Sequence, residues 1–243
     1  MPPDKPSTTS ARSGTSSDQT ASRSADPRRG IVRDALGIGI ASGAYAISYG
    51  AISTAAGLSV LQTCALSILM FTGASQFALV GVVGAGGSVW TGAVAAVLLG
   101  SRNALYGLRL ASLLNVAGVR RVAAAQFVID ETTAMAIARE DPDQSRFAFW
   151  ATGATLFILW NLGTLTGALA AHAIPNPKVF GLDAAPPAAF LALLAPRLRA
   201  REPLAIAIAA AAAAIVLLPF VPAGVPLLLI ALLVTLFGVM RRR

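Results

Sequence analysis

The sequence contains very little cysteine, histidine or charge. Its single cysteine, Cys64, excludes an internal disulfide and a zinc or iron–sulfur site built from cysteines. Its single histidine, His172, excludes a metal site built from several histidines. A P-loop, a nucleophile elbow and a dinucleotide glycine signature are also missing. The sequence therefore predicts no metal, no other cofactor and no enzymatic activity.

Apolar residues are abundant instead. Of the 243 residues, 56% are hydrophobic and only 12% are charged, which is about half the charged share of a soluble domain. Mean hydropathy is +0.70, and so much apolar surface requires lipid around most of the chain. We predict an all-α integral membrane protein. The net charge of +8 comes from short basic clusters between apolar segments, as in cytoplasmic loops, and does not require nucleic acid.

The first 30 residues differ from the rest of the chain. Residues 1–30 are rich in Ser, Thr, Pro and Ala and contain no apolar run, so we predict a disordered tail rather than a signal peptide. Arg28, Arg29 and Arg33 stand directly before the first apolar segment, which predicts a cytoplasmic N-terminus. Residues 31–243 are predicted to form the membrane domain.

This domain contains eight apolar segments, and two of them are interrupted. The second segment carries Gly73 to Phe77 in its middle, and the sixth carries Gly181 to Pro187. Such interruptions free backbone groups and suit helices that re-enter the membrane, so six to eight segments cross it. The segments are 35–57, 60–87, 88–114, 122–138, 147–172, 179–196, 203–221 and 224–240.

The two interruptions suggest pseudo-repeats over about 35–121 and 147–222. Gly50 and Phe77 match Gly163 and Phe190 at one common offset. If both interrupted segments are re-entrant, the repeats are inverted, and Arg139 and Arg146 lie on the side of the membrane opposite Arg28. If all eight segments span, these arginines share one side. The distribution of basic residues barely separates the two arrangements, and the inverted one is preferred because paired interruptions are typical of transporters.

The first interruption predicts a substrate site. Ser75 is a good N-cap for a half-helix beginning near Gln76, whose free N–H groups suit a substrate carboxylate. Gly73 permits close approach of the backbone, and Phe77 follows directly. The alternative is a packing kink in which Ser75 bonds to its own helix.

Acidic and basic residues within apolar sequence are further candidates. Asp183 is predicted to hold a substrate ammonium group or a proton, or else to cap a helix or lie in a surface loop. Arg102 and Tyr106 share one helix face, and Arg102 is positioned to clamp a carboxylate or to pair with Asp130 or Glu131.

Asp130 and Glu131 lie nine and ten residues into the segment 122–138. A spanning helix would place these two carboxylates near the bilayer centre, where they would mark a proton-coupling path. The alternative is an interfacial segment with both acids facing water.

Several of these motifs resemble the AzlC family, the large subunit of bacterial branched-chain amino acid exporters. They are Tyr49-Gly50, Phe71 to Phe77, Leu105 to Leu108, Asp130-Glu131, Trp160 with Gly163-Thr164, and Gly181 to Asp183 followed by Pro187 and Phe190. The resemblance implies a permease in the bacterial inner membrane that works with a small hydrophobic AzlD-type partner. It also implies export of Leu, Ile, Val, Met or similar compounds, for which Phe77 and Phe190 would contact the apolar side chain.

Together, these observations predict a proton-coupled secondary transporter that exports branched-chain or related amino acids. One alternative is the permease subunit of an ATP-driven transporter. The other is a membrane scaffold that transports nothing and supports a partner.

Overall fold

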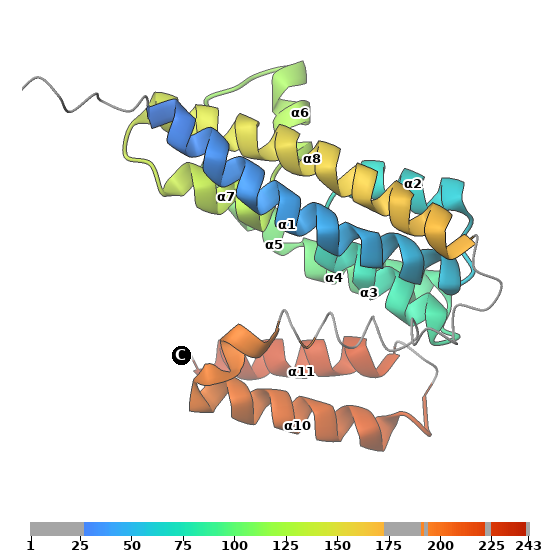
Figure 1. The fold of residues 1–243 in the computed structure, drawn as a ribbon. Helices are drawn as coiled ribbons and strands as arrows, with labels where there is room; N and C mark the ends of the chain where they lie inside the picture. Colours follow the sequence, from blue (N-terminus) through green and yellow to red (C-terminus); the bar gives the residue numbers. More distant parts are fainter. Residues whose placement is uncertain (1–26, 173–190, 192–193, 222–224, 242–243) are drawn as a thin grey trace, which may run out of the picture.

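The computed structural model describes residues 27–172, 191, 194–221 and 225–241. Within these residues all regular structure is helical, in agreement with the predicted fold class (Figure 1). The predictions for the tail before residue 27, for the interruption at Asp183 and for Phe190 lie outside the described residues.

Two long helices form the centre of the bundle, α1 (Pro27–Ala55) and α8 (Pro142–His172) (Figure 1). Both are apolar and longer than the roughly 20 residues that cross the hydrocarbon core of a bilayer. α1 begins eight residues before the predicted segment 35–57, because Pro27 suits the first position of a helix. The basic residues before the predicted segment are therefore helical.

The α1–α8 contact depends on small residues. A methyl group added to Gly50 would overlap the Thr164 carbonyl, and one added to Gly163 would overlap the Gly43 carbonyl. Small residues allow helices in membranes to approach this closely. Gly39 lies against Thr155 and Gly50 against Thr164, so residue numbers rise in the same direction along both helices. The two helices therefore run parallel.

This parallel direction disagrees with an inverted repeat that pairs segment 35–57 with segment 147–172, because inversion requires opposite directions. Contacts near the starts of α1 and α8 support the parallel direction. An Arg139 nitrogen lies 3.2 Å from Asp34 Oδ2, and Arg28 lies over the Phe147 ring at 5.2 Å. We call this end of the bundle, with Arg28, Arg33, Arg139 and Arg146, the basic end. Gly50 and Gly163 are close-packing positions on these neighbouring helices, and the pseudo-repeats over about 35–121 and 147–222 stay a prediction.

The predicted interruption of segment 60–87 is present. α2 (Val60–Leu69) and α3 (Gly73–Gly84) are separated by residues 70–72. The Ser53 and Thr63 hydroxyls are 2.8 Å apart near the end of α1, and Gly84 returns to within contact of Ala56. α2 and α3 therefore form a helical hairpin that begins and ends at the end of the bundle opposite the basic end.

The segment 88–114 is also interrupted, which the sequence analysis did not predict. α4 (Val89–Gly100) and α5 (Arg102–Leu114) meet at Ser101, whose hydroxyl donates to the Leu98 carbonyl at 2.7 Å. Side-chain bonds of this kind bend helices. α5 ends at the basic end, where Arg146 Nε donates to the Leu113 carbonyl. Together α4 and α5 cross the bundle in the direction opposite to α1.

The segment 122–138 consists of two short helices. α6 (Val119–Gln126) and α7 (Asp130–Ile137) are separated by residues 127–129, and α6 projects from the bundle beyond α8, steeply inclined to it (Figure 1). α7 ends at the basic end, where Ser145 donates to the Ala136 carbonyl. Residues 27–87 and 88–138 thus share one order of elements in opposite directions, a long crossing followed by an interrupted hairpin.

The last described helices form a separate pair. η2 (Ala195–Arg199) leads into α10 (Arg201–Leu217), and α11 (Val225–Arg241) runs back beside α10 (Figure 1). Large apolar side chains are exposed on this pair and on the bundle, as expected for surfaces that meet lipid or another membrane protein. Among the most exposed are Trp90, Val97, Leu105, Leu108, Ile208 and Ile215.

Candidate functional site

Three helix starts lie close together inside the bundle, at the beginnings of α3, α5 and α7. The Ser75 hydroxyl in the first turn of α3 is 3.1 Å from the position that a Cβ on Gly100 would take, just before α5. Arg102 at the start of α5 contacts Asp130 at the start of α7. Helix starts leave backbone N–H groups free and carry the positive end of the helix dipole, so this region favours an anionic group.

An ion pair joins α5 to α7. Arg102 Nη2 is 2.9 Å from Asp130 Oδ2, which is one of the two arrangements that the sequence predicted for Arg102. Their side chains are 30% and 37% exposed, so the pair is accessible to a small molecule. Glu131 is half-buried beside Asp130 and forms no ion pair with any described residue.

Several buried polar atoms at these three helix starts are without a hydrogen-bond partner among the described residues. They include Arg102 Nε, Asp130 Oδ1, the Asn103 side-chain oxygen, the Thr133 hydroxyl and the Ser75 hydroxyl. Buried polar groups normally find partners, so a cluster of unpaired ones indicates a place for water or a ligand. Asn103 and Thr133 were missed by the sequence analysis, although each lies within three residues of a predicted site residue.

Asp130 and Glu131 do not lie within one continuous helix over the segment 122–138, as the prediction of a spanning helix required. Both acids lie in the first turn of α7, directly after a break, where the helix dipole stabilises negative charge. The Thr132 hydroxyl accepts the Ile129 N–H at 3.1 Å and donates to the Phe127 carbonyl. This one hydroxyl pairs two backbone groups freed by the break, and it was the signal that the sequence analysis overlooked.

The predicted role of Ser75 as an N-cap was also wrong. α3 begins at Gly73 after an extended Thr72, and Ser75 already lies inside the helix, because the Gln76 N–H donates to the Thr72 carbonyl at 3.2 Å. A Cβ on Gly73 would lie 2.7 Å from the Trp160 ring. Gly73 therefore allows the Trp160 indole to pack against the turn of the hairpin.

Gln76 ties the hairpin to α8. Its side chain is fully buried; its oxygen accepts the Trp160 indole N–H at 3.0 Å, and its nitrogen donates to the Leu66 carbonyl at 3.1 Å. Gln126 of α6 donates in the same way to the Ile68 carbonyl at 2.7 Å. Two glutamine amides thus donate to carbonyls in the last turn of α2.

Aromatic rings surround the interruptions. Phe77 is fully buried, with its ring centroid 4.8 Å from Tyr45 and 5.5 Å from Tyr49. A second group places Phe71 6.1 Å from Phe127, so the turns of both interrupted hairpins meet there. The predicted site residue Tyr106 packs against an apolar cluster that includes Leu110, Leu114 and Phe149, and Phe127 packs against the same cluster.

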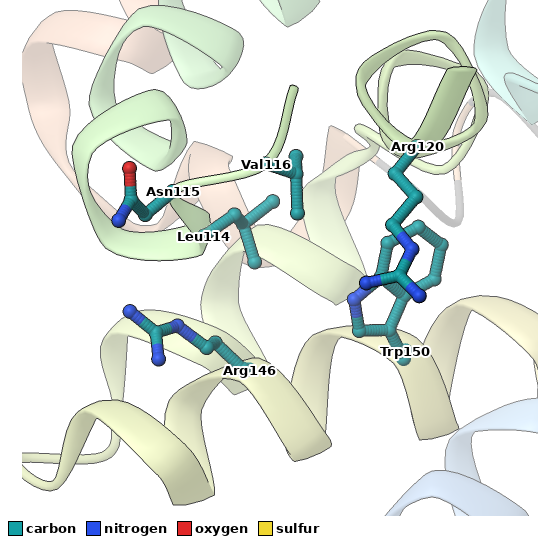
Figure 2. Close-up of a pocket in the computed structure, with 6 residues that line it drawn as sticks. All are labelled: Leu114, Asn115, Val116, Arg120, Arg146 and Trp150. Atoms are coloured by element: carbon teal, nitrogen blue, oxygen red, sulfur yellow. The ribbon is translucent and has the colours of Figure 1, made fainter. Parts of the chain in front are cut away.

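A cavity of about 460 Å³ lies elsewhere, at the basic end (Figure 2). None of the predicted site residues lines it. Its lining residues are Leu114, Asn115, Val116, Arg120, Arg146 and Trp150.

The part of the chain that is similar to known proteins coincides with the helix bundle. A family model described as AzlC protein matches residues 37–174, which covers most of α1 through α8. The inner membrane protein YgaZ of Escherichia coli K12 is 28% identical over 145 residues, which are 56% of this chain and 58% of that protein. The chain thus spans less than two thirds of this curated relative. No solved structure matches. Since the family match covers more than half of the chain, the protein belongs to the AzlC family.

Proposed function

We propose that this protein is a secondary transporter that exports branched-chain or related hydrophobic amino acids across the bacterial inner membrane. The main support is the Arg102–Asp130 pair, which lies where two helices begin inside an apolar bundle, together with the buried polar atoms at these helix starts that have no partner among the described residues. Charged residues in such surroundings are costly unless they serve a function. The inner-membrane relative and the AzlC family membership support the same proposal.

A zwitterionic amino acid fits the chemistry of this region. Its carboxylate would bind Arg102 and free N–H groups at the helix starts, and its ammonium group would bind Asp130 and Glu131. An aliphatic side chain would pack against rings such as Phe71 and Phe127, which line the two hairpin turns. Binding would then compete with the ion pair, so each substrate molecule would open and close the contact between α5 and α7.

The proposed membrane arrangement follows from the basic end. We place this end and the N-terminus in the cytoplasm, because arginines concentrate in cytoplasmic segments. α1, α4–α5 and α8 would cross the membrane, and the α2–α3 hairpin would re-enter it from the other side. The exposed apolar faces would meet lipid and a small AzlD-type subunit, as the family resemblance implies.

Efflux of preloaded, labelled leucine, valine and methionine tests the proposal in cells that carry the protein with its small partner. Arg102→Gln should lower the efflux rate about tenfold or more, because a charge-assisted hydrogen bond is worth about 1.5–3 kcal/mol. Arg109→Gln is the matched control, since Arg109 lies on the same helix but is exposed. Equal efflux by both variants and the parent would support a scaffold, and uptake that requires ATP would support an ATP-driven importer.

Proton coupling is tested separately in vesicles with an imposed pH gradient. Asp130→Asn combined with Glu131→Gln should abolish the dependence of leucine flux on the gradient, while Glu140→Gln, at an exposed position, should preserve it. If the double variant keeps the full dependence, these two acids are not the coupling site.

A further inference from the structure

The cavity at the basic end carries positive charge that no described residue neutralises fully. Arg120 of α6 and Arg146 of α8 both line it, together with the Trp150 indole and the Asn115 amide, and no acidic side chain does (Figure 2). The Arg120 side chain makes no hydrogen bond or ion pair with any described residue. Arg146 donates through Nε to the Leu113 carbonyl and contacts Asp143, which is 81% exposed. Figure 2 shows the two guanidinium groups on opposite sides of the cavity, and the Arg120 group, beside the Trp150 indole, is the one left to bind an anion.

The sequence of α8 places this cavity at the depth of a membrane surface. α8 begins with the polar residues 142–146 and becomes apolar from Phe147 onward. Trp150 follows Arg146 by four residues, hence about 6 Å further along the helix axis. Tryptophan and arginine at the boundary between polar and apolar helix are typical of the interface between lipid headgroups and acyl chains.

The surroundings of Arg120 suit an amphiphile better than a small soluble anion. Val119 directly precedes Arg120 on α6 and is 85% exposed. A free anion would gain nothing from this apolar side chain, whereas an acyl chain would cover it. Leu114 and Val116 add apolar surface inside the cavity itself.

We propose that this cavity binds the phosphate of an anionic phospholipid, with Arg120 on the phosphate oxygens and the acyl chains against α6. Guanidinium groups recognise phosphate through two parallel hydrogen bonds, and basic pockets between membrane helices are suited to such headgroups. A lipid held there links α6 to α8 and steadies a helix that makes few other contacts with the bundle. This proposal does not depend on the identity of the transported substrate.

The test is a binding titration of the purified full-length protein in detergent with dihexanoyl phosphatidylglycerol. Parallel titrations use dihexanoyl phosphatidylcholine, inorganic phosphate and leucine. Arg120→Gln should weaken phosphatidylglycerol binding about tenfold or more. Arg121→Gln removes the same charge from the neighbouring position, which does not line the cavity, and should change the affinity by less than about twofold. An unchanged Tm for both variants would show that α6 remains folded.

Each other outcome overturns the proposal. Equal losses in the two variants would indicate diffuse attraction to positive charge rather than a site. Inorganic phosphate binding as tightly as phosphatidylglycerol would identify a soluble anion as the occupant. Equal affinity for phosphatidylcholine would remove the requirement for net negative charge, and displacement by leucine would make the cavity a substrate vestibule.

Discussion

The hydrogen bond between Gln76 and Trp160 provides a sharp test of how the first hairpin is held. Gln76→Leu keeps the volume of the side chain but leaves the Trp160 indole N–H without its partner at 3.0 Å. It also removes the donor to the Leu66 carbonyl, although the Met70 N–H still donates to that oxygen at 2.9 Å. The indole N–H therefore dominates the expected loss of stability.

The size of the expected loss of stability follows from the burial of the Gln76 and Trp160 side chains. Leaving a buried donor unpaired costs about 1–3 kcal/mol in soluble proteins, whereas hydrogen bonds between membrane helices average about 0.6 and reach about 1.7 kcal/mol. Gln76 is fully buried and Trp160 is 6% exposed, so we expect a loss near the upper membrane value, about 1–2 kcal/mol. For a chain of this size, each kcal/mol lowers Tm by about 2–4 °C.

The assay is thermal unfolding of the purified protein in detergent, followed by near-UV circular dichroism. Trp160→Phe alone should also destabilise the protein, because it leaves the Gln76 side-chain oxygen without its donor. The double variant removes both partners, so its loss should fall short of the sum of the single losses by about 0.6–1.7 kcal/mol. Additive losses, or a Gln76→Leu variant as stable as the parent, would refute the argument that this bond anchors the hairpin to α8.

Three further predictions concern packing, capping and topology. Gly163→Ala should destabilise by about 1–3 kcal/mol, since the added methyl would overlap the Gly43 carbonyl, whereas Gly107→Ala, with open space around its Cβ position, should not destabilise; thermal unfolding compares them. Thr132→Val should cost about 1 kcal/mol because it unpairs the Ile129 N–H, and the exposed Thr166→Val on α8 should be nearly neutral in the same assay; equal losses would contradict the capping role. On a Cys64→Ser background, Arg29→Cys and Glu140→Cys should react with an impermeant maleimide from one side of the membrane, and Ala85→Cys from the other. Labelling of positions 29 and 140 from opposite sides would contradict the parallel arrangement of α1 and α8.

Much of the site was visible in the sequence because charged residues are rare in its apolar segments. Arg102, Asp130 and Glu131 are conspicuous there, and the run from Gly73 to Phe77 marked an interruption that the structure contains. The apolar composition alone was enough to indicate a helical membrane protein. These conclusions depend on local chemistry, since a polar group or a helix break in an apolar segment must be compensated wherever the chain goes.

The partners of those residues were decided only by the tertiary structure. Nothing local to Gln76 specifies that its amide bonds to Trp160 on α8, 84 residues away, or that Gln126 reaches the end of α2. The break before Asp130 contains neither glycine nor proline, because Thr132 satisfies its backbone groups, so the hydropathy pattern could not reveal it.

The direction of α8 relative to α1 was also decided only by the tertiary structure. Hydropathy is the same for either direction of a helix, whereas the fit of Gly50 and Gly163 into the facing backbone exists in only one of them. The sequence by itself therefore determined that the chain belongs in a membrane and which polar residue types stand at the helix starts. Close packing, which acts between residues far apart in sequence, determined how the helices are arranged around these residues.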